Sequence, residues 1–207
     1  MSNLHLIAGE GLAVGKMERM KTEEKTQARA WVGCLGCYNS GRLIGKWINA
    51  EEAADVTGQG LATLENVGGY IAPRCVICFG DEFWVMDHEG LEGFISGECS
   101  PQEAQEAAEK LEELESEGLD IGAVKAYLEN HHQTWREFDT DQFQESYAGE
   151  WDTFQEYAEN LAEECGLVDS DASWPHNCID WERASRELSW DYWEADSPSG
   201  VYVFRSL

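Results

Sequence analysis

The sequence has few basic residues. Its 207 residues include 14 Lys and Arg against 41 Asp and Glu, which gives a formal net charge of -27 at pH 7. Direct binding to DNA or RNA needs Lys and Arg to displace counterions from phosphates. This composition therefore argues against nucleic-acid binding. It favours a cationic partner, a metal-ion buffer, or binding to a protein that normally binds nucleic acid itself.

Long apolar runs are also missing. No segment is long enough to span a bilayer, and residues 1–20 lack the compact apolar stretch and cleavage site of a secretory signal. We therefore expect a cytoplasmic protein. The seven cysteines are an odd number, and without a secretory signal we expect no disulfide framework.

Catalytic motifs are missing as well. The chain has no P-loop, no dinucleotide-binding glycine pattern and no nucleophile elbow, and its five histidines form no HExxH motif. Pairs of carboxylates are so common here that they do not indicate a glycosidase. We therefore predict that the protein is not an enzyme and uses no cofactor.

The apolar content is nevertheless high enough for folding. Hydrophobic residues make up 43% of the chain, with 9 Trp, 7 Tyr and 7 Phe, whereas acidic disordered segments lack such residues. Residues 1–27 mix Gly, Lys, Glu and Met without periodicity, and we expect a flexible extension there.

The acidic excess is confined to one part of the chain. Residues 1–75 contain eight acidic and eight basic residues, whereas residues 76–207 contain 33 acidic and six basic ones. Adaptation to high salt would acidify the whole surface, and solubility does not require so much charge. Because the self-repulsion destabilises the folded state, the uneven distribution indicates a function.

The first part of the chain predicts strands. Residues 30–39 and 42–48 have strand-like spacing and are separated by a turn at Asn39–Gly41. A short helix is expected within residues 51–66, and a second strand pair in residues 70–79 and 83–87.

Helices dominate the remainder. Ser100, Pro101 and Glu103 predict a helix start with a capping box, and Gly118 predicts its end. A second helix is expected over residues 121–135 and a shorter one over 180–188, before a closing hairpin of residues 190–194 and 201–205. An aromatic series at three- or four-residue spacing predicts one or two amphipathic helices, broken near Gly149. The series comprises Phe138, Phe143, Tyr147, Trp151, Phe154, Tyr157 and Leu161.

Acidic residues recur at helical spacing. Neighbouring carboxylates in such a stripe lie roughly 5–6 Å apart, comparable to the phosphates of one DNA strand, which rise about 3.4 Å per nucleotide. A single stripe would more simply be a solvated helix face. However, 27 charges correspond to roughly 13–14 base pairs of duplex, and the stripes repeat. The candidate phosphate-mimicking residues are Glu103, Glu106, Glu109, Glu113, Glu117, Glu137, Asp139, Asp141, Glu145, Glu150, Asp152, Glu156, Glu159 and Glu163.

The cysteines offer an alternative. Cys34 and Cys37, with Cys75 and Cys78, form two CxxC pairs that could hold a structural zinc ion. This would make the chain a zinc-binding structural or regulatory protein. Because both spacers lie inside apparent strands, we favour buried core cysteines.

Four stretches together resemble the ArdA antirestriction proteins. They are RAWVGCLGCYN (29–39) with GRLIGKWI (41–48), EFWVMDHE (82–89), FQESYAGE (143–150) with Asp152 and 157–159, and IDWERASREL (179–188) with GVYVFR (200–205). The third matches the stretch called the antirestriction motif in that family.

The resemblance implies an elongated α+β protein with three small domains in a row. These would be a β-rich domain (28–98), a helical domain (99–135) and an α+β domain (136–207). It also implies a curved homodimer that occupies the DNA-binding groove of type I restriction–modification enzymes, at their methyltransferase core, in a bacterial host cell. The dimer would be supported by Phe143, Tyr147, Ala148, Gly149 and Glu150.

Overall fold

The computed structural model describes residues 27–57, 82–169, 171, 173–174 and 177–207. It is a mixed α+β structure with two small antiparallel sheets and several helices. No helix in these ranges is long and apolar enough to cross a membrane.

The first sheet has the strand order β2-β1-β3. The strands are β1 (Arg29–Cys34), β2 (Gly45–Asn49) and β3 (Phe83–Glu89). The short helices α1 (Leu35–Asn39) and η1 (Ala50–Asp55) flank β2 in sequence. Ala30 and Val32 in the central strand are completely buried.

The predicted strand over residues 30–39 is therefore wrong in its second half. β1 pairs with β2 only as far as Gly33 opposite Gly45. Beyond that point the chain turns, and the backbone N–H groups of Ser40 and Arg42 both donate to the Cys37 carbonyl. The short helix predicted in residues 51–66 is present as η1; residues 58–66 and the strand predicted at 70–79 lie outside the described residues.

Three helices follow, and local signals define their ends. α3 (Pro101–Ser116) begins where the Ser100 hydroxyl accepts a hydrogen bond from Glu103 N at 3.1 Å. It ends before Gly118, whose φ of +78° is a left-handed conformation that glycine adopts without strain. α4 (Ile121–His131) stops earlier than predicted, because His132 is left-handed. The 3-10 turn η2 (Trp135–Glu137) and α5 (Thr140–Ser146) come next.

The last part contains the second sheet, with the order β4-β6-β5. The predicted closing hairpin is confirmed as β5 (Tyr192–Asp196) and β6 (Val201–Arg205). The predicted helix α7 (Trp181–Leu188) is also present and packs against α6 (Phe154–Glu164).

One prediction in this region fails. Residues 147–151, expected to be helical, form β4 (Tyr147–Trp151), because they pair with β6. The strand carries an irregularity between Tyr147 and Gly149, where Gly149 has a φ of +106°. From Phe143 to Leu161 the aromatic series is therefore spread over α5, β4 and α6, and not over one or two helices alone.

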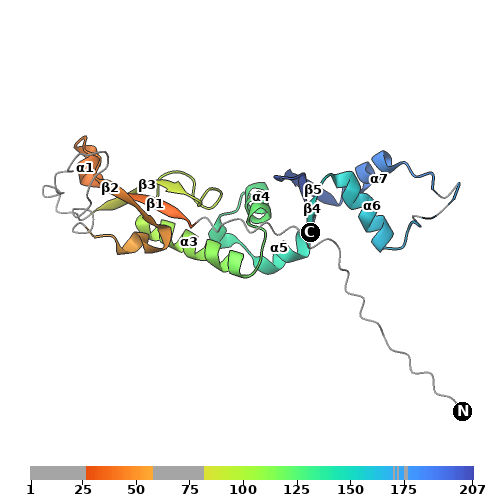
Figure 1. Cartoon of the computed structure of the whole chain (residues 1–207), viewed down its shortest axis with the longest axis horizontal. Helices are drawn as coiled ribbons and strands as arrows, with labels where there is room; N and C mark the ends of the chain where they lie inside the picture. The colour runs from red at the N-terminus through yellow and green to blue at the C-terminus, as the bar shows by residue number, and fades with distance from the viewer. Residues whose placement is uncertain (1–26, 58–81, 170, 172, 175–176) are drawn as a thin grey trace, which may run out of the picture.

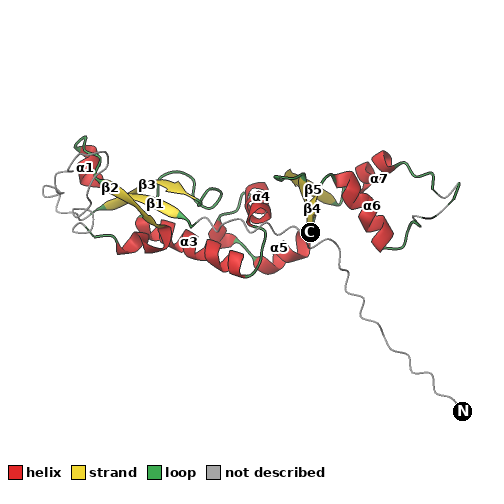
Figure 2. Cartoon of the chain, in the orientation of Figure 1, coloured by secondary structure: helices red, strands yellow, loops and turns green. Residues whose placement is uncertain are grey.

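A continuous apolar core connects these elements. One cluster of buried side chains extends from Ala28 and Val32 at the first sheet, through α3 and α4, to Phe204 in β6. Tyr127 contacts several aromatic rings there, and Trp193 stacks on Phe204 with ring centroids 4.0 Å apart. Figures 1 and 2 show the first sheet at the left with α3 beneath it, α4 and α5 near the middle, and the second sheet to their right, with α6 and α7 beyond it.

Candidate protein-interaction surface

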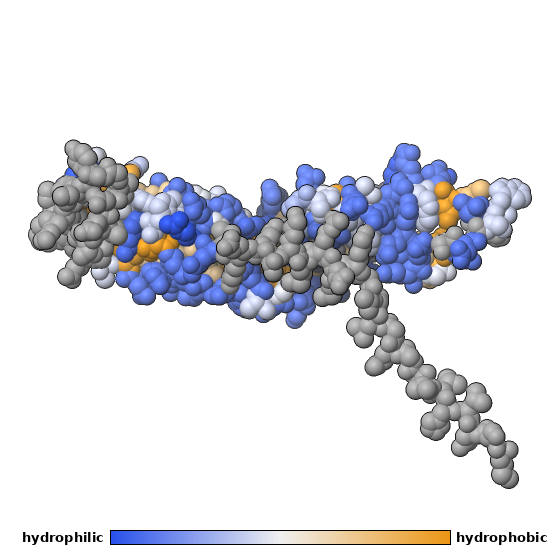
Figure 3. Space-filling view, in the orientation of Figure 1, coloured by the Kyte–Doolittle hydropathy of each residue, from blue (hydrophilic) through white to orange (hydrophobic). Residues whose placement is uncertain are grey.

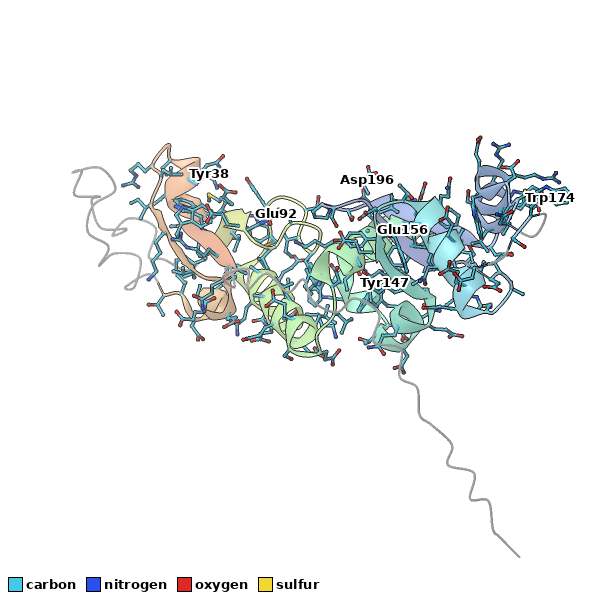
Figure 4. The ribbon with its side chains drawn as sticks, turned by 45° about the vertical axis from the view of Figure 1, so that its right-hand side comes forward. Tyr38, Glu92, Tyr147, Glu156, Trp174 and Asp196 are labelled. Carbon is cyan, nitrogen blue, oxygen red and sulfur yellow. The ribbon has the colours of Figure 1, made fainter. Side chains whose placement is uncertain are left out.

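The acidic side chains lie on the outside of the fold. Among the described residues, the only buried polar or charged one is Ser146, so no described Asp or Glu is buried. Figure 3 shows hydrophilic residues over most of the visible face of the middle and C-terminal parts. Figure 4 shows side chains projecting outward along the ribbon, among them Glu156 on α6 and Asp196 at the end of β5. The predicted acidic surface therefore consists of solvent-accessible charge.

The stripe on α3 is interrupted at its N-terminal end by Arg136. This guanidinium donates from Nη1 to Glu103 at 3.2 Å and from Nη2 to Glu106 at 3.0 Å. It also lies over the Trp135 ring, 4.2 Å from the centroid. Hydrogen bonds from Gln102 and Arg136 lower the pKa of Glu106. These two candidate residues are therefore engaged by the protein's own cation.

Only one of the two hydrogen bonds of the capping box predicted at Ser100 and Glu103 is found among these contacts. The Ser100 hydroxyl caps the Glu103 N–H as expected. The Glu103 carboxylate binds Arg136, a residue 33 positions away, which no local pattern in the sequence could indicate.

The other carboxylates of the α3 stripe contact only side chains of the same helix in the hydrogen bonds and ion pairs of the described residues. Glu109 accepts from Gln105 at 2.9 Å, and Lys110 lies 3.2 Å from Glu113. Glu117 is exposed at the C-terminal cap, and the last turn contains no basic residue. Because a helix C-terminus carries a partial negative charge, the helix end adds to the negative charge of Glu117 there.

Glu137 and Asp139 contribute to helix starts as well as to surface charge. Glu137 accepts from both the backbone and the hydroxyl of Thr134, and these hydrogen bonds lower the pKa of Glu137. The Asp139 carboxylate accepts from Gln142 N at 3.0 Å at the start of α5. Asp141 and Glu145 are exposed on the same helix.

Two of the candidate carboxylates near the second sheet accept hydrogen bonds from residues of neighbouring turns. Glu150 accepts from the Ser199 hydroxyl at 2.7 Å, and the neighbouring Ser197 and Ser199 side chains lower the pKa of Glu150. Glu156 accepts from Asp152 N at 3.2 Å at the start of α6. Two further carboxylates lie on α6, the partly exposed Glu159 and the exposed Glu163.

The segment from Phe143 to Glu150 lies partly in the core. Phe143 is completely enclosed in the aromatic core, and Tyr147 stacks on it with centroids 5.2 Å apart. Burial, followed by the nearby Asp120 carboxylate, raises the pKa of Tyr147. Ala148 and Gly149 are half-buried in β4, whereas Glu150 is exposed.

The described residues do not support the zinc alternative. Cys34 and Cys37 are buried beside Ile44 in a small apolar cluster, whereas Cys75 and Cys78 lie outside the described residues. In the described ranges, no group of three or more His, Cys, Asp or Glu side chains is arranged to hold a metal ion.

The structure adds a feature that the sequence pattern missed. A shallow groove runs between α3 and η2, next to the Arg136 contacts. Its lining residues are Glu106, Glu109, Lys110, Glu113, Trp135, Arg136 and Phe138. Hydrophobic periodicity predicts Trp135 and Phe138 as apolar positions but says nothing about their neighbours on α3.

The sequence model for the family described as "Antirestriction protein (ArdA)" matches residues 30–198. No individual curated protein matches the chain significantly. The match begins in β1 and ends in the turn before β6, so it includes the acidic helices and the segment from Phe143 to Glu150. Since it covers well over half of the 207 residues, the chain belongs to the ArdA family of antirestriction proteins.

Proposed function

We propose that this protein inhibits type I restriction–modification enzymes by placing its carboxylates where DNA phosphates would lie in the groove of the methyltransferase core. It would act by competition, with no substrate and no turnover. Membership of the ArdA family supports the antirestriction role. The observation that carries the mechanism is the net charge of -27, which arises entirely within residues 76–207 and whose described carboxylates all lie on side chains that are not buried.

The arrangement of the cations supports the same mechanism. Four of the six Lys and Arg residues in this part of the chain form ion pairs with carboxylates of the protein itself: Lys110, Arg136, Arg183 and Arg186. They therefore add little positive potential that would repel a DNA-binding groove. Such a groove is lined by Lys and Arg, and it attracts an acidic surface at long range.

The proposal includes the arrangement that the family resemblance implies. Three units, residues 28–98, 99–135 and 136–207, would lie in a row, and two copies would join through their last units. The extended array of carboxylates would then follow a length of duplex. The protein would act in the cytoplasm of a bacterial host, where restriction enzymes meet incoming DNA.

Matched charge removal tests the mechanism. E109Q/E117Q removes two exposed carboxylates from the α3 stripe, whereas E52Q/D55N removes two exposed ones from the neutral N-terminal third. Both changes raise the net charge by the same amount. We expect the stripe variant to bind a type I methyltransferase at least about tenfold more weakly. The slope of log affinity against log salt concentration (the salt slope) should be smaller by about two.

The N-terminal control should bind within about twofold of the unmodified protein, since only charges facing a phosphate-binding groove contribute strongly. Equal losses in the two variants would show that total charge, and not its placement, determines inhibition. The proposed mimicry would then be wrong.

A further inference from the structure

Arg136 is held in place by three side chains from two elements. Its guanidinium lies over Trp135, and its two terminal nitrogens reach Glu103 and Glu106, which are one helical turn apart on α3. Trp135 is only 8% exposed, so the ring is a fixed platform. The capping box between Thr134 and Glu137 fixes the turn on which Arg136 stands.

This arrangement differs from the ion pairs of α7. Arg183 pairs with Glu187, and Arg186 pairs with Glu182, each within one helix and at side chains that are more than two-thirds exposed. Such pairs are worth little and exchange readily with solvent. Arg136 instead joins η2 to α3 across 30 and 33 residues of sequence. A planar guanidinium that spans two carboxylates is geometrically specific.

The consequence is an uneven electrostatic potential along α3. At its N-terminal half, one cation faces two carboxylates, and the helix dipole adds further positive potential. At its C-terminal half the dipole is negative, Lys110 pairs with Glu113 on the same helix, and no basic residue occupies the last turn. An incoming Lys or Arg would have to displace Arg136 to reach Glu103 or Glu106, but not to reach Glu109 or Glu117.

We propose that Arg136 is an internal counterion that withdraws Glu103 and Glu106 from the surface offered to a basic partner, so that the partner contacts α3 from Glu109 onward. Arg136 is thus a residue that determines which carboxylates are used. The inference rests on the proposed function only for the identity of the partner. Arg136 would mask Glu103 and Glu106 from any basic surface.

The chain offers a matched control for this role. R136Q and R183Q each remove one positive charge, but only R136Q releases a pair of carboxylates on α3. Binding of each variant is measured at several salt concentrations to a type I methyltransferase core and, separately, to a hexa-arginine peptide. Near-ultraviolet circular dichroism verifies that the packing of the aromatic core is retained in each variant.

We expect R136Q to bind both probes about threefold or more tightly than R183Q, with a salt slope steeper by about one. Equal binding of R136Q and R183Q, or weaker binding by a folded R136Q, would overturn the role of Arg136. Should R136Q fail to fold, R136K keeps the charge but loses the fork. R136K must then bind more tightly than the unmodified protein, and unchanged binding overturns the inference.

The two probes separate the two claims. If the unmodified protein does not bind the methyltransferase, the proposed function fails, while the peptide still tests the masking by Arg136. If the protein binds the methyltransferase and R136Q matches R183Q, only the inference about Arg136 fails.

Discussion

The hydroxyl of Tyr202 lies directly against the backbone of Gly122. A Cβ atom built at Gly122 would overlap this hydroxyl and approach the Asp120 carboxylate. Gly122 is in the first turn of α4, and Tyr202 is in the central strand of the second sheet. Their contact therefore fixes the middle helices against the C-terminal sheet, within the continuous core.

Gly122→Ala should destabilise the protein by about 1–2 kcal/mol, measured by urea unfolding. Alanine favours a helix interior by about 1 kcal/mol relative to glycine, but overpacking a filled core costs about 1–3 kcal/mol. Y202F removes the overlapping oxygen. The loss of stability caused by G122A, measured as G122A/Y202F against Y202F, should therefore be less than half of the loss that G122A causes in the unmodified protein. An alanine variant as stable as the unmodified protein would mean that this contact is looser than described.

The buried hydroxyl of Tyr147 should make the free energy of unfolding fall at alkaline pH. Burial and the Asp120 carboxylate raise the pKa of Tyr147 above its ordinary value of 10 in the folded state. A group with a raised folded-state pKa contributes its full stability below pH 10 and loses it as the pH rises above that value. Each such tyrosine lowers the free energy of unfolding by at most about 1.4 kcal/mol per pH unit.

Y147F should therefore show a shallower decline in stability above pH 10 than the unmodified protein. Y38F, which removes a tyrosine hydroxyl at a half-exposed site, is the matched control. Identical alkaline slopes for Y147F and the unmodified protein would contradict the burial of this hydroxyl beside Asp120.

The cysteines should differ in reactivity. Burial, and to a lesser extent the Glu103 carboxylate, raises the pKa of the Cys99 thiol to about 11. Because the thiolate is the reactive form, Cys99 should resist iodoacetamide in the native protein, whereas the exposed Cys165 and Cys178 should react. Peptide mass mapping after a short exposure measures the order. Alkylation of Cys99 as fast as Cys165 would show that the core around Cys99 opens readily.

Salt should stabilise the free protein. Raising NaCl from about 0.1 to about 1 M shortens the Debye length from about 10 to about 3 Å and screens repulsion between neighbouring carboxylates. Since each like-charged helical pair costs roughly 0.2–0.5 kcal/mol, the free energy of unfolding should rise by on the order of 1–2 kcal/mol. A urea midpoint that stays constant or falls with NaCl would show that the carboxylates do not repel one another as described.

Local signals in the sequence predicted the helices well. Ser100, Pro101 and Gly118 define α3 through contacts within a few residues, so the sequence alone predicts its ends. Asp180 likewise caps α7 by accepting from Arg183 N. The closing hairpin was predicted because its strands are adjacent in the sequence.

The errors arose where distant residues decide the structure. β4 forms because Tyr147–Trp151 meets β6, some fifty residues later, although its aromatic spacing fits a helix. Arg136 neutralises part of the α3 stripe through contacts that spacing cannot reveal. The sequence therefore predicted the acidic surface as a whole, but not which carboxylates are engaged within the fold.

Competition with DNA is the most direct test of the central claim. A type I methyltransferase core is bound to a fluorescent duplex that carries its target site, and the full-length protein is added at increasing concentration. We predict complete displacement of the duplex at a stoichiometric excess, with an apparent affinity that weakens steeply as salt rises. Formation of a ternary complex in which the duplex stays bound, or binding that does not respond to salt, would contradict the account.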